Sequence, residues 1–257
     1  MSYLVFLLVF LVPPVLALAA TLPKPLAGRG GLRARIALPL VALIALVYTT
    51  PWDNYLVYRR VWWYGPDRVL ATIGYVPIEE YAFFVLQPLL AGLVLYHLLA
   101  RWPEPSPEPG RRWPGALVYG AGTLAGGALL ASGAESGLYL GLILAWACPV
   151  LLGMWVFGGG YLARHRRVLL LAIALPTLYL WVADRIAIGL GIWDISNQYS
   201  FDVDPLGLPV EEAVFFLVTN LLAVKGTMLF LFGDRIAGER DRVNASGAEG
   251  TLPAPRG

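Results

Sequence analysis

Seven long apolar segments constrain the fold of this 257-residue chain more than any other feature. A run of about twenty apolar residues can cross the hydrocarbon core of a bilayer as a helix. Charged residues make up only 14% of the chain, whereas a soluble domain carries about 25%. We therefore predict an all-α membrane protein with about seven transmembrane helices. These cover residues 3–20, 34–50, 78–100, 115–131, 137–157, 167–189 and 210–232.

The basic residues predict the orientation. Fourteen of the 19 Lys and Arg residues lie in or beside 21–33, 101–114, 158–167 and the C-terminal tail, all on one side of the predicted bundle. Cytoplasmic loops of membrane proteins are enriched in Lys and Arg. We therefore expect a multi-pass protein of the cell membrane, with an external N-terminus and a cytoplasmic C-terminus. The net charge of +2 suggests no nucleic-acid partner.

The external loops 51–77 and 190–209 belong to an internal repeat. Both copies contain the pattern Pro-Ile/Val-Glu-Glu-x-x-Phe-Phe, and an Asp and a Trp precede it. Because the copies lie four predicted spans apart, they point the same way and form two parallel three-helix repeats joined by a linking helix. The matched positions are Asp53 with Asp184 and Trp62 with Trp193, at an offset of 131, and Pro77, Glu79, Glu80, Phe83 and Phe84 with Pro209, Glu211, Glu212, Phe215 and Phe216, at an offset of 132.

The repeat divides the chain into four parts. Residues 1–100 form a first module and 134–233 a second, with a linker and linking helix at 101–133. Within that linker, 103–109 reads as a stiff Pro-rich stretch. Residues 234–257 have the composition of a disordered cytoplasmic tail.

The paired Glu residues are the main candidates for chemistry. In the first turn of a helix they also suit the helix dipole, which is an ordinary structural role. However, Asp53 and Asp184 are expected near the same depth, and ionisable groups close to hydrocarbon are functional candidates. A carboxyl group out of water keeps its proton more readily and can act as a general acid. The sequence leaves open which Glu of each pair does so.

Aromatic residues surround these carboxyls. Each motif Phe follows a Glu by four residues, so it lies one turn deeper on the same helix face. Trp and Tyr residues at this depth commonly form an interfacial belt, but aromatic faces also stabilise a desolvated cation. Carboxyl groups beside aromatic faces are suited to protonating an alkene and to stabilising the carbocation that forms.

The chain resembles a known family at these residues. The duplicated motif, the Trp52-Asp53-Asn54 sequence and the two-module layout are similar to those of the integral-membrane lycopene cyclases of bacteria, archaea and fungi. The second copy departs from the first, since Ala183-Asp184-Arg185 stands in place of Trp52-Asp53-Asn54.

The resemblance implies an isomerase (an intramolecular lyase) of carotenoid biosynthesis. It would convert lycopene through γ-carotene to β-carotene without a cofactor or a metal. Membrane lipid surrounds such an enzyme, and other carotenoid-pathway enzymes would be its partners. The resemblance makes Glu79, Glu80, Glu211, Glu212, Asp53 and Asp184 catalytic candidates, and Trp52, Asn54, Trp62, Trp63, Phe83, Phe84, Trp193, Phe215 and Phe216 substrate-binding candidates.

Two other functional classes share some of these sequence features. A retinal-binding photoreceptor or pump has seven helices and a lysine in the last one, but we expect Lys225 to reach the cytoplasmic surface instead. A small-solute transporter can contain parallel repeats, but these acids gather at one face and not at the midplane. His97 and His165 are expected near the cytoplasmic surface, in solvated or snorkelling positions.

Overall fold

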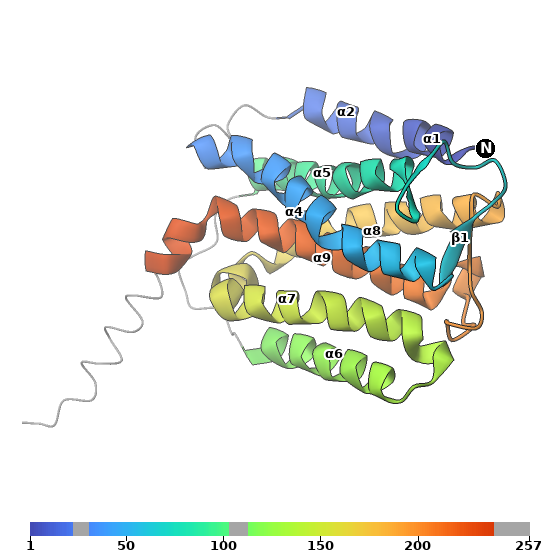
Figure 1. Ribbon diagram of the computed structural model, residues 1–257. Coiled ribbons are helices and arrows are strands. Elements are labelled where there is room, and N and C mark those ends of the chain that lie inside the picture. Colours follow the sequence, from blue (N-terminus) through green and yellow to red (C-terminus); the bar gives the residue numbers. More distant parts are fainter. Residues whose placement is uncertain (23–30, 103–112, 239–257) are drawn as a thin grey trace, which may run out of the picture.

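The computed structural model describes residues 1–22, 31–102 and 113–238 and forms a bundle of long helices (Figure 1). In these ranges, seven helices are long and apolar enough to cross a membrane by length and composition. They coincide with the seven predicted spans, which confirms the predicted fold class and points to a membrane protein. In order they are α1–η1–α2 (Tyr3–Phe6, Leu7–Leu11, Val12–Ala20), α4 (Gly31–Tyr58), α5 (Ile78–Arg101), α6 (Trp113–Ala131), α7 (Leu138–Arg164), α8 (Arg166–Gly189) and α9 (Val210–Leu231).

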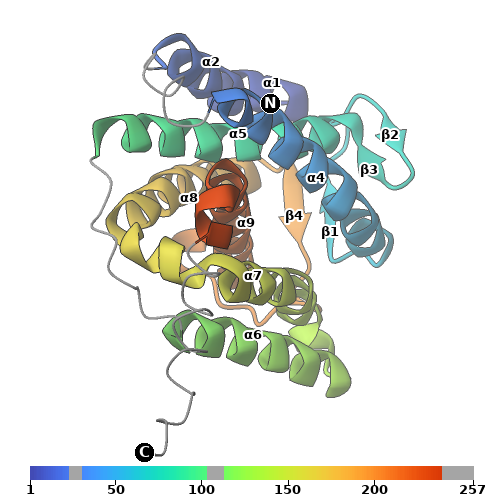
Figure 2. The ribbon, with the colours of Figure 1, turned by 90° about the vertical axis from the view of Figure 1, so that its left-hand side faces the viewer.

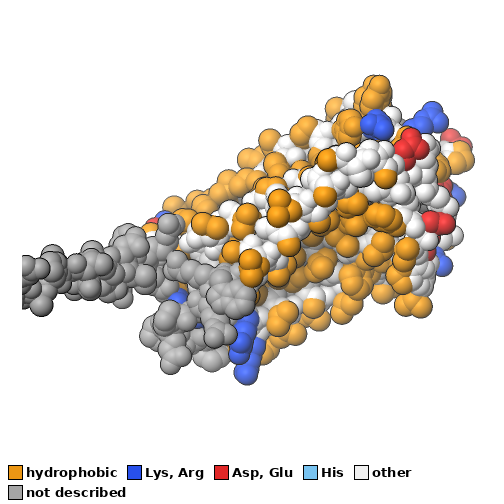
Figure 3. Space-filling model, turned by 90° about the horizontal axis from the view of Figure 1, so that it is seen from below, with side chains coloured by type: hydrophobic (Ala, Val, Ile, Leu, Met, Phe, Trp, Pro, Cys, Tyr) orange, Lys and Arg blue, Asp and Glu red, His pale blue; other side chains and the backbone are white. Residues whose placement is uncertain are grey.

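Helices α5 and α9 form the centre of the bundle. They pack against each other, and α4 and α8 pack against both (Figure 2). Helix α2 packs on α5 and helix α7 packs on α9, while α6 packs mainly on α7. Accordingly, 67% of the α5 span is buried inside the protein but only 6% of the α6 span. Apolar side chains cover the flank of the bundle, as expected where lipid is the solvent (Figure 3).

Four short strands lie at the end of the bundle that carries the N-terminus, here called the strand end (Figure 1). Strand β1 (Trp62–Tyr64) pairs antiparallel with β4 (Trp193–Ile195). Strands β2 (Thr72–Ile73) and β3 (Val76–Pro77) form a hairpin. Short 3₁₀ turns at Glu135–Gly137 and Pro205–Gly207 complete this end of the molecule.

The register of the β1–β4 pair agrees with the predicted repeat. Trp63 lies opposite Asp194, at the offset of 131 that relates Trp62 to Trp193. Trp62 lies opposite Ile195, which is the match of Tyr64, and Tyr64 lies opposite Trp193, which is the match of Trp62. Exchanging the two copies therefore leaves the pairing unchanged. This is the register that a two-fold axis between the modules would produce.

Three predicted boundaries were wrong. Helix α4 continues through Pro51 to Tyr58, so Asp53 is helical and not in a loop. Packing of this turn against the bundle outweighs the loss of one helical hydrogen bond at Pro51. Helix α7 runs to Arg164, with a break at Gly158, where the predicted loop 158–167 was expected.

The third wrong boundary is that of the tail. Residues 233–238 are helical, and Ile236 is buried. The rest of the predicted tail and the Pro-rich stretch 103–109 lie outside the described residues.

The buried cations also differ from expectation. Lys225 is only 3% exposed and does not reach the surface. Its ammonium lies 4.0 Å from the ring centre of Tyr119 and 5.1 Å from that of Trp155, and it donates a hydrogen bond to the Tyr119 hydroxyl. This aromatic cage replaces water around the charge. His97 and His165 are buried as well, so neither occupies the solvated position that was one of the two expected for them.

Candidate active site

A cavity at the strand end brings four carboxyl side chains together. Asp53 from α4, Glu80 from α5, Asp184 from α8 and Glu212 from α9 all line it. Within the described residues, none of them has a Lys, Arg or His partner at ion-pair distance. Asp53, Asp184 and Glu212 are buried and Glu80 is partly buried. Negative charges there without a cation would be very costly, so this arrangement favours carboxyls that hold protons.

Glu80 and Glu212 are each held by tyrosine hydroxyls. The Tyr3 and Tyr64 hydroxyls donate to Oε2 of Glu80, at 2.6 and 3.1 Å. In the second module, the Tyr139 hydroxyl donates to Oε1 of Glu212 at 2.6 Å. These bonds fix the carboxyls at the cavity wall.

Tyr64 lies in β1, outside the spanning helices. Its burial, and then the negative charge that Glu80 carries once it has lost its own proton, raise the pKa of Tyr64 well above its usual value of 10. The phenol therefore keeps its proton and stays a hydrogen-bond donor to Glu80.

The other Glu of each pair has a different role. Oε1 of Glu79 accepts a hydrogen bond from the Leu70 backbone N–H at 2.8 Å. Oε1 of Glu211 accepts one from the Phe201 N–H, also at 2.8 Å. Neither residue lines the cavity. Both anchor the loop that precedes their helix, so adjacent Glu residues divide into a cavity group and a loop group.

The two aspartates are the least satisfied groups of the cavity. Asp53 is 1% and Asp184 2% exposed. Oδ1 of Asp184 accepts a hydrogen bond from the Trp193 indole at 2.9 Å. In the part of the chain that the structure describes, Oδ2 of each aspartate is buried without a protein hydrogen-bond partner. Such atoms are free to exchange a proton with a neighbouring carboxyl or a substrate.

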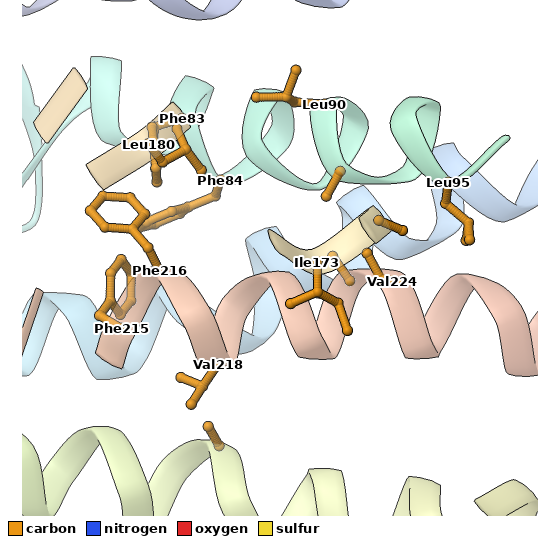
Figure 4. Packing of buried hydrophobic residues seen from close by; sticks show 14 of the residues in the cluster. Phe83, Phe84, Leu90, Leu95, Ile173, Leu180, Phe215, Phe216, Val218 and Val224 are labelled. Carbon is orange, nitrogen blue, oxygen red and sulfur yellow. The ribbon is translucent and has the colours of Figure 1, made fainter. Parts of the chain in front are cut away.

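Aromatic rings from both modules form the rest of the wall. Phe83 and Phe216 meet edge to face between α5 and α9, with ring centres 6.1 Å apart (Figure 4). The Trp193 ring packs on the rings of Tyr3 and Phe6, with centres 4.9 and 5.2 Å apart. The aromatic lining consists of Tyr3, Phe6, Trp62, Tyr64, Phe83, Tyr139, Trp193, Phe215 and Phe216.

Comparison with known proteins identifies the family. The family model described as lycopene cyclase matches residues 1–99 and 136–230. The chain belongs to the lycopene cyclase family. Its predicted membership is thereby confirmed, and with it an isomerase of carotenoid biosynthesis.

Individual relatives agree with the family match. The chain is 45% identical over 232 residues to a lycopene beta-cyclase of Halobacterium salinarum, which covers 89% of this chain and 95% of the relative. It is 37% identical over 221 residues to a bifunctional lycopene cyclase/phytoene synthase of Phycomyces blakesleeanus, covering 82% of this chain and 36% of that protein. No solved structure matches the chain.

The cavity gathers most of the substrate-binding residues proposed from sequence, but not all of them. Trp62, Phe83, Trp193, Phe215 and Phe216 line it. The others lie elsewhere.

Trp52 lies behind the wall, stacked on Phe215 with parallel rings 5.7 Å apart. Phe84 lines a second, apolar cavity. Trp63 is 44% exposed.

Asn54 has a structural role. Its side chain accepts a hydrogen bond from the Tyr75 N–H and holds the β2–β3 hairpin against α4. The Gly74 backbone approaches Asn54 so closely that a Cβ atom would lie 2.4 Å from Oδ1. Gly74 also has a φ of +67°, which favours glycine.

Sequence reasoning missed the tyrosines that hold the carboxyls. A signal for two of them was present, because the first helices of the modules align at an offset of 136. That alignment matches Tyr3 with Tyr139 and Pro13 with Pro149. Tyr64 has Ile195 at its matching position and gives no such signal.

Proposed function

We propose that this chain is a lycopene β-cyclase that converts lycopene through γ-carotene to β-carotene. The observation that carries the proposal is the meeting of Glu80 and Glu212, one from each module, in a single aromatic-walled cavity. The Halobacterium relative, named a lycopene beta-cyclase, supports the substrate and the ring type.

The reaction requires only a proton donor and a base. The carboxyl of Glu80 or Glu212 protonates the terminal double bond of the polyene, which leaves a tertiary carbocation. The next double bond along the chain supplies its electron pair, closes a six-membered ring and moves the positive charge into it. Loss of a neighbouring ring proton to a carboxylate forms the new double bond. Atoms and charge balance, so substrate and product are isomers.

The wall of the cavity suits the charge that this reaction develops. The faces of Trp62, Trp193 and Phe216 stabilise a desolvated cation electrostatically. Exclusion of water also protects the carbocation from capture as an alcohol. The same rings provide an apolar surface for the hydrocarbon end group.

The four carboxyls of the cavity can take up the proton that the ring releases. The tyrosines fix Glu80 and Glu212 at the wall, while Oδ2 of Asp53 and of Asp184 is buried and unpaired among the described residues. In this proposal Glu80 and Glu212 exchange the proton with substrate, and the aspartates share it between turnovers. Glu79 and Glu211 act as positioning residues through the loops they anchor.

Expression in a bacterium that accumulates lycopene tests the proposal. We expect pigment chromatography to show conversion of lycopene to a product with two β-rings. A second strain carrying the Glu80→Gln/Glu212→Gln variant should retain lycopene and serves as the control. Unchanged lycopene with well-expressed wild-type protein would overturn the proposed function.

The proposed setting is the cell membrane, with the strand end external and the C-terminus cytoplasmic, as the distribution of Lys and Arg predicts. Reporter fusions at the two termini test this orientation. Association with other enzymes of the pathway is also proposed, since the Phycomyces relative is fused to a phytoene synthase.

A further inference from the structure

A second cavity, of about 300 Å³, lies between α4, α5, α7 and α9. Its lining contains no Lys, Arg, Asp or Glu. Polar groups in the lining are few, chiefly those of Tyr48, Thr49, Gln87 and Thr219. The cavity is therefore suited to a hydrocarbon without a charged head group.

This apolar cavity, here called the channel, adjoins the acid-lined cavity. Phe83 and Phe215 line both spaces, so their rings form the partition. On α9 the lining extends from Phe215 to Phe230. Fifteen residues of helix span about 22 Å, so the channel runs from the acids towards the opposite end of the bundle.

The channel also reaches the lipid-facing flank, between α4 and α7. Ile44, Tyr48 and Trp146 line the channel and also an outer groove of the protein. Leu43 and Val47, in the same groove, are 56% and 65% exposed. The lateral mouth of the channel is thus made of apolar side chains that already face the membrane.

Tyr48 and Trp146 contact each other at this mouth. The Tyr48 hydroxyl donates to the Trp146 carbonyl at 2.9 Å, and the two rings stack with centres 5.3 Å apart. One hydrogen bond and one stacked pair are weak enough to open and close at room temperature.

We infer that the polyene enters laterally from the membrane between α4 and α7, and that its non-reacting part occupies this channel while one end group meets the acids. The inference rests on the proposed function and adds the binding site of the substrate tail. It commits to a long uncharged polyene as the occupant. A phospholipid would bring a charged head group for which the lining has no partner.

The volumes of the two cavities support the placement of an end group at the acids and of the rest of the polyene in the channel. The acid-lined cavity measures about 50 Å³, which is room for only a few water molecules. An end group can enter only if Phe83 or Phe215 rotates, whereas the larger channel accepts an extended chain.

Blocking the channel at depth tests the inference. A Cβ atom at Gly226 would lie 3.5 Å from Met154 Cε and 4.0 Å from Val41 Cγ2, so the backbone tolerates a side chain there. Gly226→Leu would fill the channel about 16 Å below Phe215. Gly153→Leu is the matched control, because Gly153 is exposed on α7 and has no atom within 4 Å of an added Cβ. Ala45→Leu, from α4, is a second blocking variant.

Two readouts separate this inference from the proposed function. The first is the turnover of lycopene relative to that of a shortened apocarotenoid with the same end group, whose chain ends above Gly226. We expect Gly226→Leu to lower this ratio about ten-fold, because the leucine side chain occupies space that the lycopene chain needs, and about 1.4 kcal/mol of overpacking is a factor of ten in binding. Gly153→Leu should leave the ratio unchanged.

The second readout is the lycopene that copurifies with each protein, which does not depend on catalysis. Retention should fall in Gly226→Leu and Ala45→Leu but not in Gly153→Leu. Equal ratios and equal retention in all three variants would overturn the channel. If wild type binds lycopene but cyclises neither substrate, the proposed function fails and the channel stands. Copurified phospholipid in place of lycopene would also overturn the assigned occupant.

Discussion

Adjacent glutamates with different hydrogen bonds give the sharpest prediction. Glu80→Gln keeps an amide oxygen that can accept from Tyr3 and Tyr64, but it has no acidic proton to transfer. General acid catalysis typically contributes about 10²–10⁴ in rate. We expect the cyclisation rate of Glu80→Gln to fall by that factor, with little change in thermal stability.

Glu79→Gln should show the opposite behaviour. Its amide oxygen can still accept from the Leu70 N–H, but the amide nitrogen replaces Oε2, which is buried without a protein partner in the described part of the chain. A buried unsatisfied donor costs about 1–3 kcal/mol. We expect a lower unfolding temperature and a rate per folded molecule within a few-fold of wild type.

The assay is the initial rate of product formation in lipid vesicles, normalised to folded protein. Thermal unfolding of the same samples supplies the stability. The Glu211→Gln and Glu212→Gln variants repeat the comparison in the second module. Equal losses of rate in Glu79→Gln and Glu80→Gln, at equal folded content, would refute the division of roles.

Three further predictions concern the supports of the site. Tyr139→Phe removes the hydroxyl that holds Glu212, so turnover should drop several-fold and unfolding should become easier by about 1–3 kcal/mol, as kinetics and calorimetry would show. Asn54→Ala frees the Tyr75 N–H and should cost about 1 kcal/mol of stability, with the product ratio on chromatography unchanged. Tyr64 has its pKa raised above 10 by burial and by Glu80. Above pH 10 the unfolded chain therefore releases a proton that the folded protein keeps, so this contribution to stability is lost as pH rises. An alkaline unfolding titration should consequently show a steeper fall for wild type than for Tyr64→Phe.

Much of the fold was predictable because lipid imposes simple rules on a chain. A spanning segment must be helical, long and apolar, and each of the seven segments is. The first-turn position of the motif glutamates was also predicted correctly. Pro77 and Pro209 directly precede the first residues of α5 and α9, where a missing N–H costs nothing.

The division of labour within each Glu pair could not be read from sequence. It depends on where the N–H groups of Leu70 and Phe201 lie, and both belong to irregular loops whose path is set by tertiary contacts. The end of α4 was missed for a related reason. Proline and charge at 51–53 suggest a helix end, but Asp53 faces the interior of the bundle and packing continues the helix.

Contacts across the modules explain why two similar copies build a single cavity. Tyr48 and Tyr179 occupy matching positions, at the offset of 131. Each donates to a backbone carbonyl in the first helix of the other module: Tyr48 to Trp146 and Tyr179 to Phe10.

Two further contacts join the modules. Strand β1 of the first pairs with β4 of the second, and the Trp52 ring stacks on both Trp146 and Phe215. Each predicted module therefore supplies two carboxyl-bearing helices and part of the wall around those of the other module. A lone copy would expose its acids to lipid or water and lack half of the aromatic surface. We propose that equivalent groups from the two copies treat the two ends of a symmetric polyene in turn within this one cavity.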